Sequence, residues 1–372
     1  MQLLDSLPNR LLEAVPNPLL ASLQDIANNV QIQSNFCIIH PNYKPLELPA
    51  EVVARFQRLP LELQQKYLNL QLRSFLYGIY YNGSMQATLA PEDETSSVAL
   101  LPNLENNTFL GMNLAFYERL HRSNFGRGYF DPGWQVLRQE SDGALAVKKG
   151  ELTLHIERDR HLIPSQQSAE IGDVVAIRMP KNLMQNGFYM AVSNAGLHNW
   201  SYSNSNPTTI RIYFHLTPEG AVAVMASLTQ QLNEIKIPFS FKVLYNPAGY
   251  NRYDSGVLYF ERCQYPIVRY VLQEIYTENQ AHFKPQIPLF TKQLSPGLAV
   301  AEEPNHKFSE QESFGMNRCQ IVANGLLEAR HKGDNSSDSR MNAILQQFFL
   351  LKIDWQCPYL NANSEDIYTP LY

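Results

Sequence analysis

The segment of residues 209–260 constrains the fold of this chain most strongly, because it alternates between strand and helix patterns. Apolar residues recur at helical spacing after Pro218 and Glu219, a pair that is typical of a helix start. The sequence NPAG at 246–249 is typical of a turn. We therefore expect a helix that begins at Pro218 and three strands, at 210–216, 239–245 and 256–260.

The first expected strand has two different faces, because successive side chains in a strand alternate. Arg211, Tyr213 and His215 share a polar, cationic face, and the side chains between them are apolar. Lys242 is the one charged residue of the second expected strand, which is otherwise mainly Phe, Val and Leu. A lysine in such surroundings is costly to bury unless it has a partner or a task.

Composition excludes several classes of protein. The 372 residues, 44% of them hydrophobic, suffice for one large domain or two, and the net charge of -5 argues against a global positive field for nucleic acid. The four cysteines form no CxxC pair, which argues against a zinc site or a disulfide framework and fits a reducing cytoplasm. The chain has no signal-peptide pattern and no apolar run of about 18 residues. We therefore expect a cytoplasmic protein without a membrane span.

The order of patterns along the chain predicts an α+β architecture. Residues 1–30 and 49–81 look helical with proline interruptions, and a polar, acidic stretch at 84–108 is the best candidate for a boundary or mobile loop. Beyond it, strand and helix patterns mix, and the proline-rich stretches 38–49 and 287–304 are expected to be loops. We predict a helical N-terminal region, 1–110, and an α+β domain, 111–372, with an antiparallel-rich twisted sheet flanked by helices.

Common catalytic motifs are missing from the sequence. FGRGYF at 125–130 resembles a phosphate-binding glycine loop but lacks the Lys-Ser/Thr of a P-loop, so we interpret it as a tight turn or a backbone contact to a ligand. The chain has no GxSxG, no HExxH and no protein-kinase signature. The usual sequence evidence for a hydrolase, a metalloprotease or a kinase is therefore missing.

Cations and hydroxyl groups remain as the candidate functional residues of the central segment. Arginine binds a phosphate dianion bidentately, an amine beside other cations can act as a base near neutrality, and a histidine can protonate a leaving oxygen. Together they can eliminate phosphate from phosphoserine or phosphothreonine without a metal ion or another cofactor. The candidates are Arg211, Tyr213, His215, Lys242, Arg252, Tyr259 and Arg318, followed by the cations Lys149, Arg178, Lys181 and Lys292.

Each of these residues also has a structural interpretation. His215 at a strand end can be a structural histidine, Lys242 can extend from a half-buried strand to solvent, and the tyrosines can be packing residues. Arg252 and Asp254 can form a surface ion pair. A simple hairpin centred on 247–249 places Lys242 opposite Ser255 and Arg252 on the other face, so Arg252 reaches the site only through a bulge or a loop.

These residues also carry a resemblance to known families. The order of a strand with YFHL, a helix, FKVLYNPAGYNR and a strand SGVLYF is similar to the secreted bacterial phosphothreonine lyases that inactivate host MAP kinases. A closer resemblance, over most of residues 110–330, is to the HopA family of plant-pathogen effectors and stand-alone lyases of lanthipeptide-type gene clusters. It rests on NFGRGYFDPGW, GFYMAVSNAG, RIYFHLTPEGA, PFSFK, YNRYDSGVLYF, PLFTKQLSPGLAVAEEP and ESFGMNRC.

The resemblance implies roles for individual residues. Lys242 is the implied general base, His215 the implied general acid, and Arg252 and Tyr259 are implied contacts to phosphate or substrate. The MAP-kinase lyases place a lysine two residues before the acid histidine, where this chain has a tyrosine. Arg211, on the same strand face, can supply the missing cation.

The implied activity is a phosphoserine/phosphothreonine lyase that leaves dehydroalanine or dehydrobutyrine in a ribosomally made precursor peptide. Because the chain has no kinase signature, a separate Ser/Thr kinase is the expected partner, together with a cyclase. The alternative is an effector-type protein that binds phosphopeptide without turnover; a third interpretation is a scaffold or cyclisation partner of a modifying complex. A binding protein needs arginines but no base, so the presence of both Lys242 and His215 favours the lyase.

Overall fold

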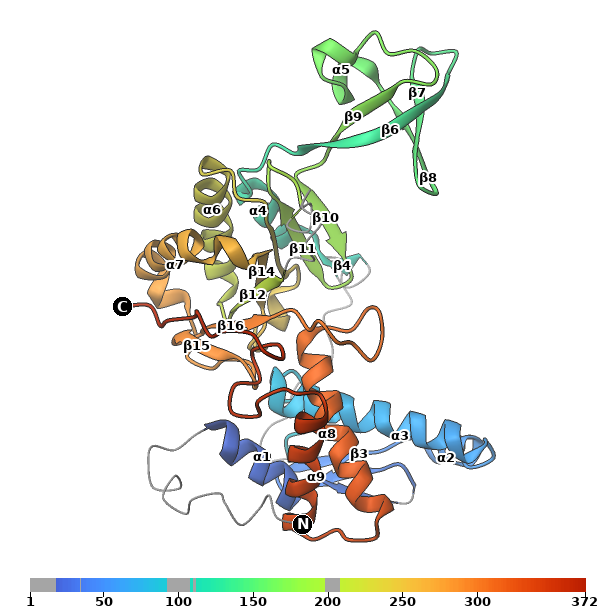
Figure 1. The fold of residues 1–372 in the computed structure, drawn as a ribbon, viewed down its shortest axis with the longest axis vertical. Helices are drawn as coiled ribbons and strands as arrows, with labels where there is room; N and C mark the ends of the chain where they lie inside the picture. The colour runs from blue at the N-terminus through green and yellow to red at the C-terminus, as the bar shows by residue number, and fades with distance from the viewer. Residues whose placement is uncertain (1–17, 34, 92–107, 110–111, 198–207) are drawn as a thin grey trace. The chain divides into compact units, whose positions relative to one another are not determined.

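The structure, a computed structural model, describes residues 18–33, 35–91, 108–109, 112–197 and 208–372. It is α+β, as predicted, with antiparallel sheets and flanking helices (Figure 1). The helices expected before residue 18 and most of the loop expected at 84–108 lie outside the described residues. Two compact units are formed: Met1–Tyr81, Met85–Glu92 and Gly315–Pro358 in the first, and Asn82–Ser84, Asp93–Phe314 and Tyr359–Tyr372 in the second.

The first unit combines helices with a small sheet. Its helices are α1 (Pro18–Asn29), α2 (Ala50–Phe56), α3 (Leu61–Leu76, continued by a π-helical turn, Tyr77–Tyr81), α8 (Phe314–His331) and α9 (Ser337–Leu350). Its strands are β1 (Gln31–Ile32), β2 (Ile38–His40) and β3 (Tyr43–Leu46). The expected loop at 38–49 is therefore wrong. Pro45 is compatible with β3 because β3 is an edge strand, where a missing N–H costs no ladder hydrogen bond.

Side-chain hydrogen bonds tie α8 to the N-terminal helices. Asn69 Nδ2 in α3 donates to Asn324 Oδ1 in α8 at 2.9 Å, and Arg73 Nη1 donates to Gln320 Oε1 at 3.3 Å. Helix α9 packs against α1. Residues 315–358, which the sequence assigned to the C-terminal region, thus fold with the N-terminal helices, while the boundary between residues 110 and 111 remains a prediction.

The second unit is built on a seven-stranded antiparallel sheet in the order β10-β11-β13-β14-β12-β16-β15. Its strands are β10 (Asn182–Gln185), β11 (Phe188–Val192), β12 (Thr209–Phe214), β13 (Ser240–Leu244), β14 (Gly256–Glu261), β15 (Lys292–Ser295) and β16 (Leu298–Glu302). The expectation of a loop at 287–304 is wrong, because β15 and β16 form a hairpin there. Gly297, at a φ of 74°, takes the left-handed conformation that the tight turn requires.

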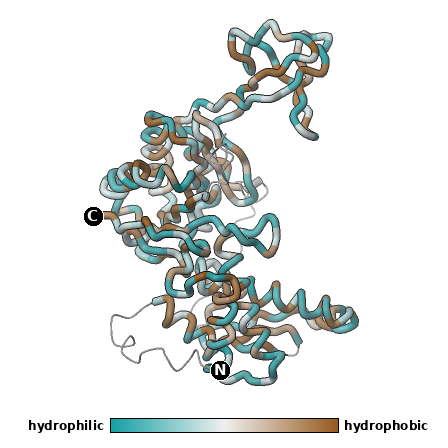
Figure 2. The backbone as a smooth tube through the Cα atoms, in the orientation of Figure 1, coloured by the Kyte–Doolittle hydropathy of each residue, from teal (hydrophilic) through white to brown (hydrophobic). Residues whose placement is uncertain are grey.

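One face of this sheet is an apolar core. Ile212, Phe241 and Leu258, from three neighbouring strands, are fully buried on it. Helices α6 (Pro218–Glu234) and α7 (Tyr265–Asn279) lie on one side of the sheet (Figure 1), and the hydrophobic colouring runs through these strands (Figure 2). Phe283 links α7 to this face, since its ring contacts Phe214 at 6.2 Å and Tyr276 of α7 at 4.7 Å between centroids.

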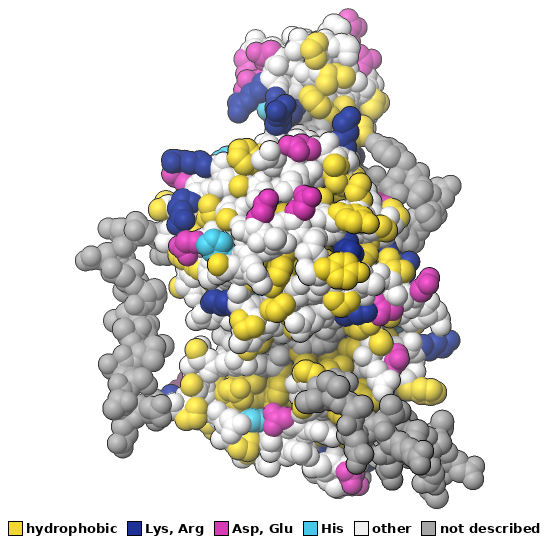
Figure 3. Space-filling model, turned by 90° about the vertical axis from the view of Figure 1, so that its left-hand side faces the viewer, with side chains coloured by type: hydrophobic (Ala, Val, Ile, Leu, Met, Phe, Trp, Pro, Cys, Tyr) yellow, Lys and Arg dark blue, Asp and Glu magenta, His cyan; other side chains and the backbone are white. Residues whose placement is uncertain are grey.

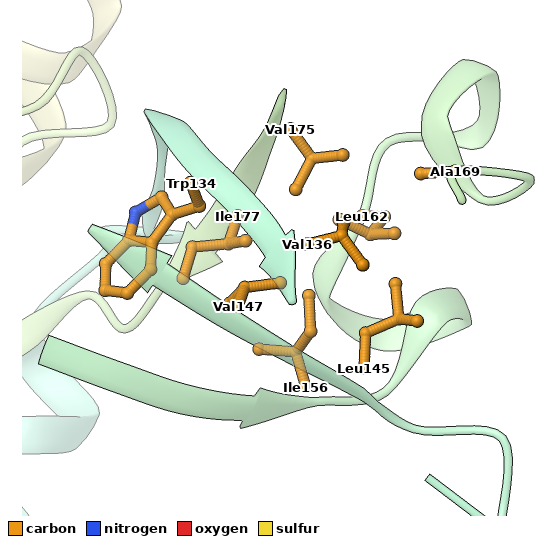
Figure 4. Packing of buried hydrophobic residues seen from close by; sticks show 9 residues of the cluster. All are labelled: Trp134, Val136, Leu145, Val147, Ile156, Leu162, Ala169, Val175 and Ile177. Carbon is orange, nitrogen blue, oxygen red and sulfur yellow. The ribbon is translucent and has the colours of Figure 1, made fainter. Parts of the chain in front are cut away.

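A smaller four-stranded sheet in the same unit has its own core. Its order is β8-β7-β6-β9, with β6 (Tyr129–Gln139), β7 (Leu145–Lys149), β8 (Leu152–Ile156) and β9 (Val174–Met179), and helix α5 (Arg158–His161) follows β8. Trp134, Val147 and Ile177 pack together in its core (Figure 4). Before it come the short strands β4 (Thr108–Phe109) and β5 (Met112–Asn113) and helix α4 (Leu114–Ser123).

The FGRGYF segment connects α4 to β6. Gly128 has a φ of 84°, and a Cβ atom on it would collide with the carbonyl oxygen of Met179. The close approach of two backbone segments therefore accounts for this glycine, rather than the tight turn that we expected from the sequence.

Candidate active site

The register of the central strands brings the predicted cations to one face of the large sheet. Arg211 pairs with Tyr259 across β12 and β14, Tyr213 pairs with Val257, and Lys242 of β13 also pairs with Val257. Paired residues share a face, and so do residues two apart in a strand. Arg211, Tyr213, Lys242 and Tyr259 therefore line the face opposite the apolar core.

The simple hairpin expected between β13 and β14 is wrong. Lys242 pairs with Val257 rather than with Ser255, because the connection is longer than a tight turn. A 3₁₀ turn at Pro247–Gly249 begins this connection, and the Tyr250 hydroxyl donates to the carbonyl oxygen of Leu244 at 2.7 Å. Arg252 lies within this loop, so strand alternation does not determine the direction of its side chain.

Lys242 is held by aromatic rings rather than by a carboxylate. Its Nζ lies 4.6 Å from the ring centroid of Phe188 and 5.4 Å from that of Tyr259, and it donates to Gln185 Oε1 at 3.3 Å. No acidic side chain of the described residues forms an ion pair with this half-buried amine. The rings hold the ammonium by cation–π attraction and leave it accessible for chemistry.

Arg252 shares the Phe188 ring with Lys242. Its Cζ lies 5.6 Å from the Phe188 centroid, and its Nε and Nη2 donate to Asp254 at 2.8 and 3.0 Å. The carboxylate of Asp254 is buried and also accepts from Asn82 Nδ2 at 3.2 Å. The predicted ion pair of Arg252 and Asp254 is therefore present, but it is partly buried and bidentate, and the loop brings its guanidinium to the Phe188 ring that Lys242 also contacts.

His215 lies just beyond β12 and is 2% exposed. Its Nδ1 is 3.0 Å from the carbonyl oxygen of Gln286, which can only accept, so Nδ1 carries the proton. Its Nε2 is buried and has no hydrogen-bond partner among the described residues. Burial lowers the pKa of His215 to about 4, and the charge of Lys284 adds to this effect, while the Gln286 hydrogen bond and Asp254 oppose it. Near pH 7 the histidine is neutral and presents the Nε2 lone pair.

Arg211 is buried against Tyr259 and paired with Glu303. Its Cζ lies 4.9 Å from the Tyr259 ring centroid, its Nη1 donates to the Tyr259 hydroxyl at 3.4 Å, and its Nε donates to Glu303. Burial by itself raises the pKa of Glu303, but Arg211 and Lys307 hold that pKa below its usual value. The Arg211 charge is therefore balanced within the protein, and a phosphate would compete with Glu303 for it.

The remaining cation candidates lie elsewhere and bond to other groups. Lys149 Nζ contacts Asp131 in the small sheet at 2.5 Å, Arg178 donates to the carbonyl of Arg127, and Lys181 to those of His121 and Asn124. Lys292 at the sheet edge pairs with Asp366, and Arg318 is buried in the first unit, where it donates to Asn317 and the Pro358 carbonyl.

Three residues of the site were not predicted. Phe188 and Gln185 contact Lys242 from β11 and β10, and Lys284 acts on His215 from a loop. Strand alternation at 188–192, within the motif GFYMAVSNAG, could have indicated Phe188 once the pairing of β11 with β13 was known. No local sequence pattern indicates that Lys284 belongs to the site.

The fold and site thus define an α+β protein with an antiparallel sheet, one apolar face and one face rich in cations and aromatic rings. Residues 179–360, just under half of the chain, match the HopA1 effector protein family, and the predicted resemblance to that family is confirmed. The matched segment contains Lys242, His215 and Arg252.

Two solved structures of effector proteins are similar to this chain. That from Pseudomonas syringae pv. tomato strain DC3000 has a TM-score of 0.41 and 16% identity over 78% of this chain and 90% of that one. That from P. syringae pv. syringae strain 61 has a TM-score of 0.40 and 15% identity over 67% and 81%. A comparison with curated proteins gave no match.

Neither a metal-binding cluster nor a membrane-spanning helix is found among the described residues. Within 18–33, 35–91, 108–109, 112–197 and 208–372, no three His, Cys, Asp or Glu side chains are grouped to hold a metal ion. No helix in these ranges is both long and apolar enough to cross a membrane. On the side drawn in Figure 3, basic and acidic side chains are interspersed with hydrophobic ones outside the grey residues.

Proposed function

We propose that this protein is a lyase that eliminates phosphate from phosphoserine or phosphothreonine in a peptide. The observation that carries the proposal is Lys242, an accessible amine without a carboxylate partner among the described residues, held by the ring of Phe188, which Arg252 also contacts. The match of residues 179–360 to the HopA1 effector protein family supports it.

In the proposed reaction, Lys242 in its amine form removes the α-proton of the phosphorylated residue. The electron pair of the Cα–H bond forms the Cα=Cβ bond, the Cβ–O bond breaks, and phosphate leaves with that oxygen. The product is dehydroalanine from phosphoserine or dehydrobutyrine from phosphothreonine. The guanidinium of Arg252 and the ammonium that Lys242 becomes on taking the proton stabilise the charge that develops on the leaving group.

The leaving oxygen needs a proton, and His215 is the proposed carrier. In the free protein its pKa of about 4 leaves Nε2 unprotonated, but a phosphate dianion placed beside Nε2 favours the imidazolium. Substrate binding is thus expected to recruit the proton that the acid step uses. Lys242 and His215 lie two strands and two residues apart, about 12 Å between Cα atoms, and the proposed substrate residue binds between their side chains.

Binding without turnover is the alternative function. A binding protein needs arginines but no base, and here Arg211 and Arg252 are each paired with a carboxylate while Lys242 is not. The cation without such a partner is the residue suited to act as a base. This distribution of charge favours elimination over binding alone.

The proposed substrate is a phosphorylated precursor peptide, with a separate kinase as the enzyme that supplies the phosphate and a cyclase as a further partner. The cations around Lys242 suit a phosphate already in place, since hydroxide is too poor a leaving group for these residues to expel.

Mass spectrometry of synthetic peptides tests this function. With purified protein, a phosphothreonine peptide should lose the mass of phosphoric acid in the presence of EDTA and without ATP. The matched unphosphorylated peptide with ATP and magnesium should remain unchanged. Dehydration of the unphosphorylated peptide, or inhibition of the phosphopeptide reaction by EDTA, would contradict the proposal.

A further inference from the structure

The first unit contains a polar pocket that the proposed lyase reaction does not use. The pocket has a volume of about 260 Å³ and is lined by residues from α1, β1, α8 and α9 and from the turn between the last two helices. Asn28, Gln31 and Asn335 contribute amide groups to it, and Arg330 and Arg340 contribute guanidinium groups. All five residues belong to the first unit.

Arg340 has a partial structural explanation. It is 7% exposed, and its Nη2 donates to the carbonyl oxygens of Ile26 and Val30 at the C-terminal end of α1. A cation at this end of a helix binds free carbonyl groups and interacts favourably with the helix dipole. These neutral carbonyls occupy one nitrogen of the guanidinium and do not balance its charge.

Arg330 has no such explanation. It lies in the last turn of α8, and its Nη1 is buried with no hydrogen-bond partner among the described residues. Neither Arg330 nor Arg340 forms an ion pair with a described residue. Arginine stays charged in proteins, and burial of an unpaired charge is costly. Burial lowers the pKa of both guanidinium groups, which indicates that water solvates them poorly.

We infer that this pocket is a binding site for a phosphate dianion. Two uncompensated positive charges match the two negative charges of a phosphate group above about pH 6. Arg330 can form a bidentate contact with the phosphate oxygens, and Arg340 can donate through Nε or Nη1, because its Nη2 is used by the carbonyls of α1. The side-chain amides of Asn28, Gln31 and Asn335 offer further donors.

The phosphate has two possible sources with the same chemistry: a phosphorylated side chain of a peptide, and free inorganic phosphate. The inference concerns a second phosphate site and is independent of whether the large sheet catalyses elimination.

Isothermal titration calorimetry with inorganic phosphate, at pH 7.5 in chloride buffer, tests the site in the full chain. Arg330→Gln keeps a polar side chain but removes the charge, and we expect it to weaken phosphate binding at this site at least about 10-fold. Lys332→Gln removes one positive charge from a nearby exposed position and Lys242→Gln removes one from the large sheet; both should retain this binding. Unchanged phosphate affinity in Arg330→Gln, or binding lost only in Lys242→Gln, would overturn the inference.

Competition separates the two sources and checks the preference for a dianion. A phosphoserine peptide is added to the Lys242→Gln protein with phosphate bound in the pocket of Arg330 and Arg340. If the natural ligand is a phosphorylated peptide, the peptide should displace the phosphate. If the natural ligand is free phosphate, the peptide should leave the phosphate bound. Acetate should bind at least about 10-fold more weakly than phosphate, and equal affinity would overturn the assignment to a dianion. Failure of the lyase proposal would appear instead as absence of elimination by the wild-type protein, with these titrations unaffected.

Discussion

The two faces of the seven-stranded sheet are built from alternate residues of the same strands and have opposite physical characters. On one face, Phe241 and Ile212 are fully buried in an apolar core. On the other, Lys242 and Arg211 lie against the rings of Phe188 and Tyr259. The neighbouring residues Phe241 and Lys242 of β13 thus belong to the core and to the candidate site, respectively. Substitution of each one tests the two faces separately.

The cations of the polar face also differ from one another. Arg211 and Arg252 each have a carboxylate partner, whereas Lys242 has aromatic rings and an amide. Charge that is already balanced contributes to the fold, and an amine that is not balanced is available for chemistry. The comparison of the two faces therefore predicts a graded series of effects.

The largest expected effect is on catalysis, from Lys242→Ala. Because the side chain is only half-buried and has no ion pair with a described residue, the protein should stay folded while elimination falls by about 10²–10⁴-fold or more. Phosphate release from a phosphothreonine peptide measures the rate, and circular dichroism measures the fold. Lys242→Arg is the matched control, since it keeps the charge but cannot act as a base. Wild-type rates in either variant would remove Lys242 from the mechanism.

The neighbouring substitution Phe241→Ala should affect stability instead. Phe241 is fully buried, and its ring contacts that of Phe214 at 5.3 Å between centroids, so truncation should lower the free energy of unfolding by about 3–5 kcal/mol. Urea denaturation measures the loss. Elimination per folded molecule should change much less than in Lys242→Ala. A stable Phe241→Ala protein with no activity would contradict the assignment of stability to the apolar face and of catalysis to the polar face.

His215 should make stability depend on pH. Its pKa is about 4 in the folded protein and about 6.5 in the unfolded chain, so between these values the unfolded chain binds more protons. Stability should therefore fall as the pH drops from 6.5 to 4, by up to about 3 kcal/mol, and this contribution should level off below pH 4. Urea denaturation at pH 7 and pH 4.5 would show it as a steeper loss in wild type than in His215→Asn. Equal losses would contradict the buried, neutral histidine.

Arg252 should contribute to recognition of phosphate. Its replacement alone leaves the buried Asp254 without its cation, so the informative variant is the double substitution Arg252→Ala with Asp254→Asn. Binding of a phosphopeptide should weaken by about 1.5–3 kcal/mol, and binding of the unphosphorylated peptide should be unchanged. Calorimetry compares the two, with Asp254→Asn alone as control. Equal weakening for both peptides would show that Arg252 does not hold the phosphate.

The smallest effect is expected from Lys149→Ala in the small sheet. Its side chain is 41% exposed and pairs with Asp131, an arrangement that typically contributes about 1 kcal/mol or less. Elimination should change by less than about twofold, and thermal unfolding only slightly. A tenfold loss of elimination activity would show that Lys149 of the small sheet contributes to the active site.

Local patterns of the sequence predicted much of the central segment. Residue types and spacing predicted the helix start at Pro218 and the shared face of Arg211 and Tyr213. The strands expected at 210–216, 239–245 and 256–260 correspond to β12, β13 and β14, although β12 ends at Phe214, before His215. These features depend on interactions between residues close in the sequence, and the periodicity of apolar residues reflects such interactions. The resemblance to the HopA family, carried by motifs spread along the chain, was also apparent from the sequence and agrees with the family match.

Tertiary structure decided what depends on segments far apart in the chain. The pairing of Lys242 with Val257, the contact of both Lys242 and Arg252 with the Phe188 ring, and the hairpin of β15 and β16 in a proline-rich stretch all require partners that no local pattern specifies. Strand register and the surroundings of a buried charge are set by which strands and loops meet, because hydrogen bonds and desolvation act between neighbours in space. For the same reason the sequence showed which residues carry charge, and only the fold showed which of those charges are already balanced.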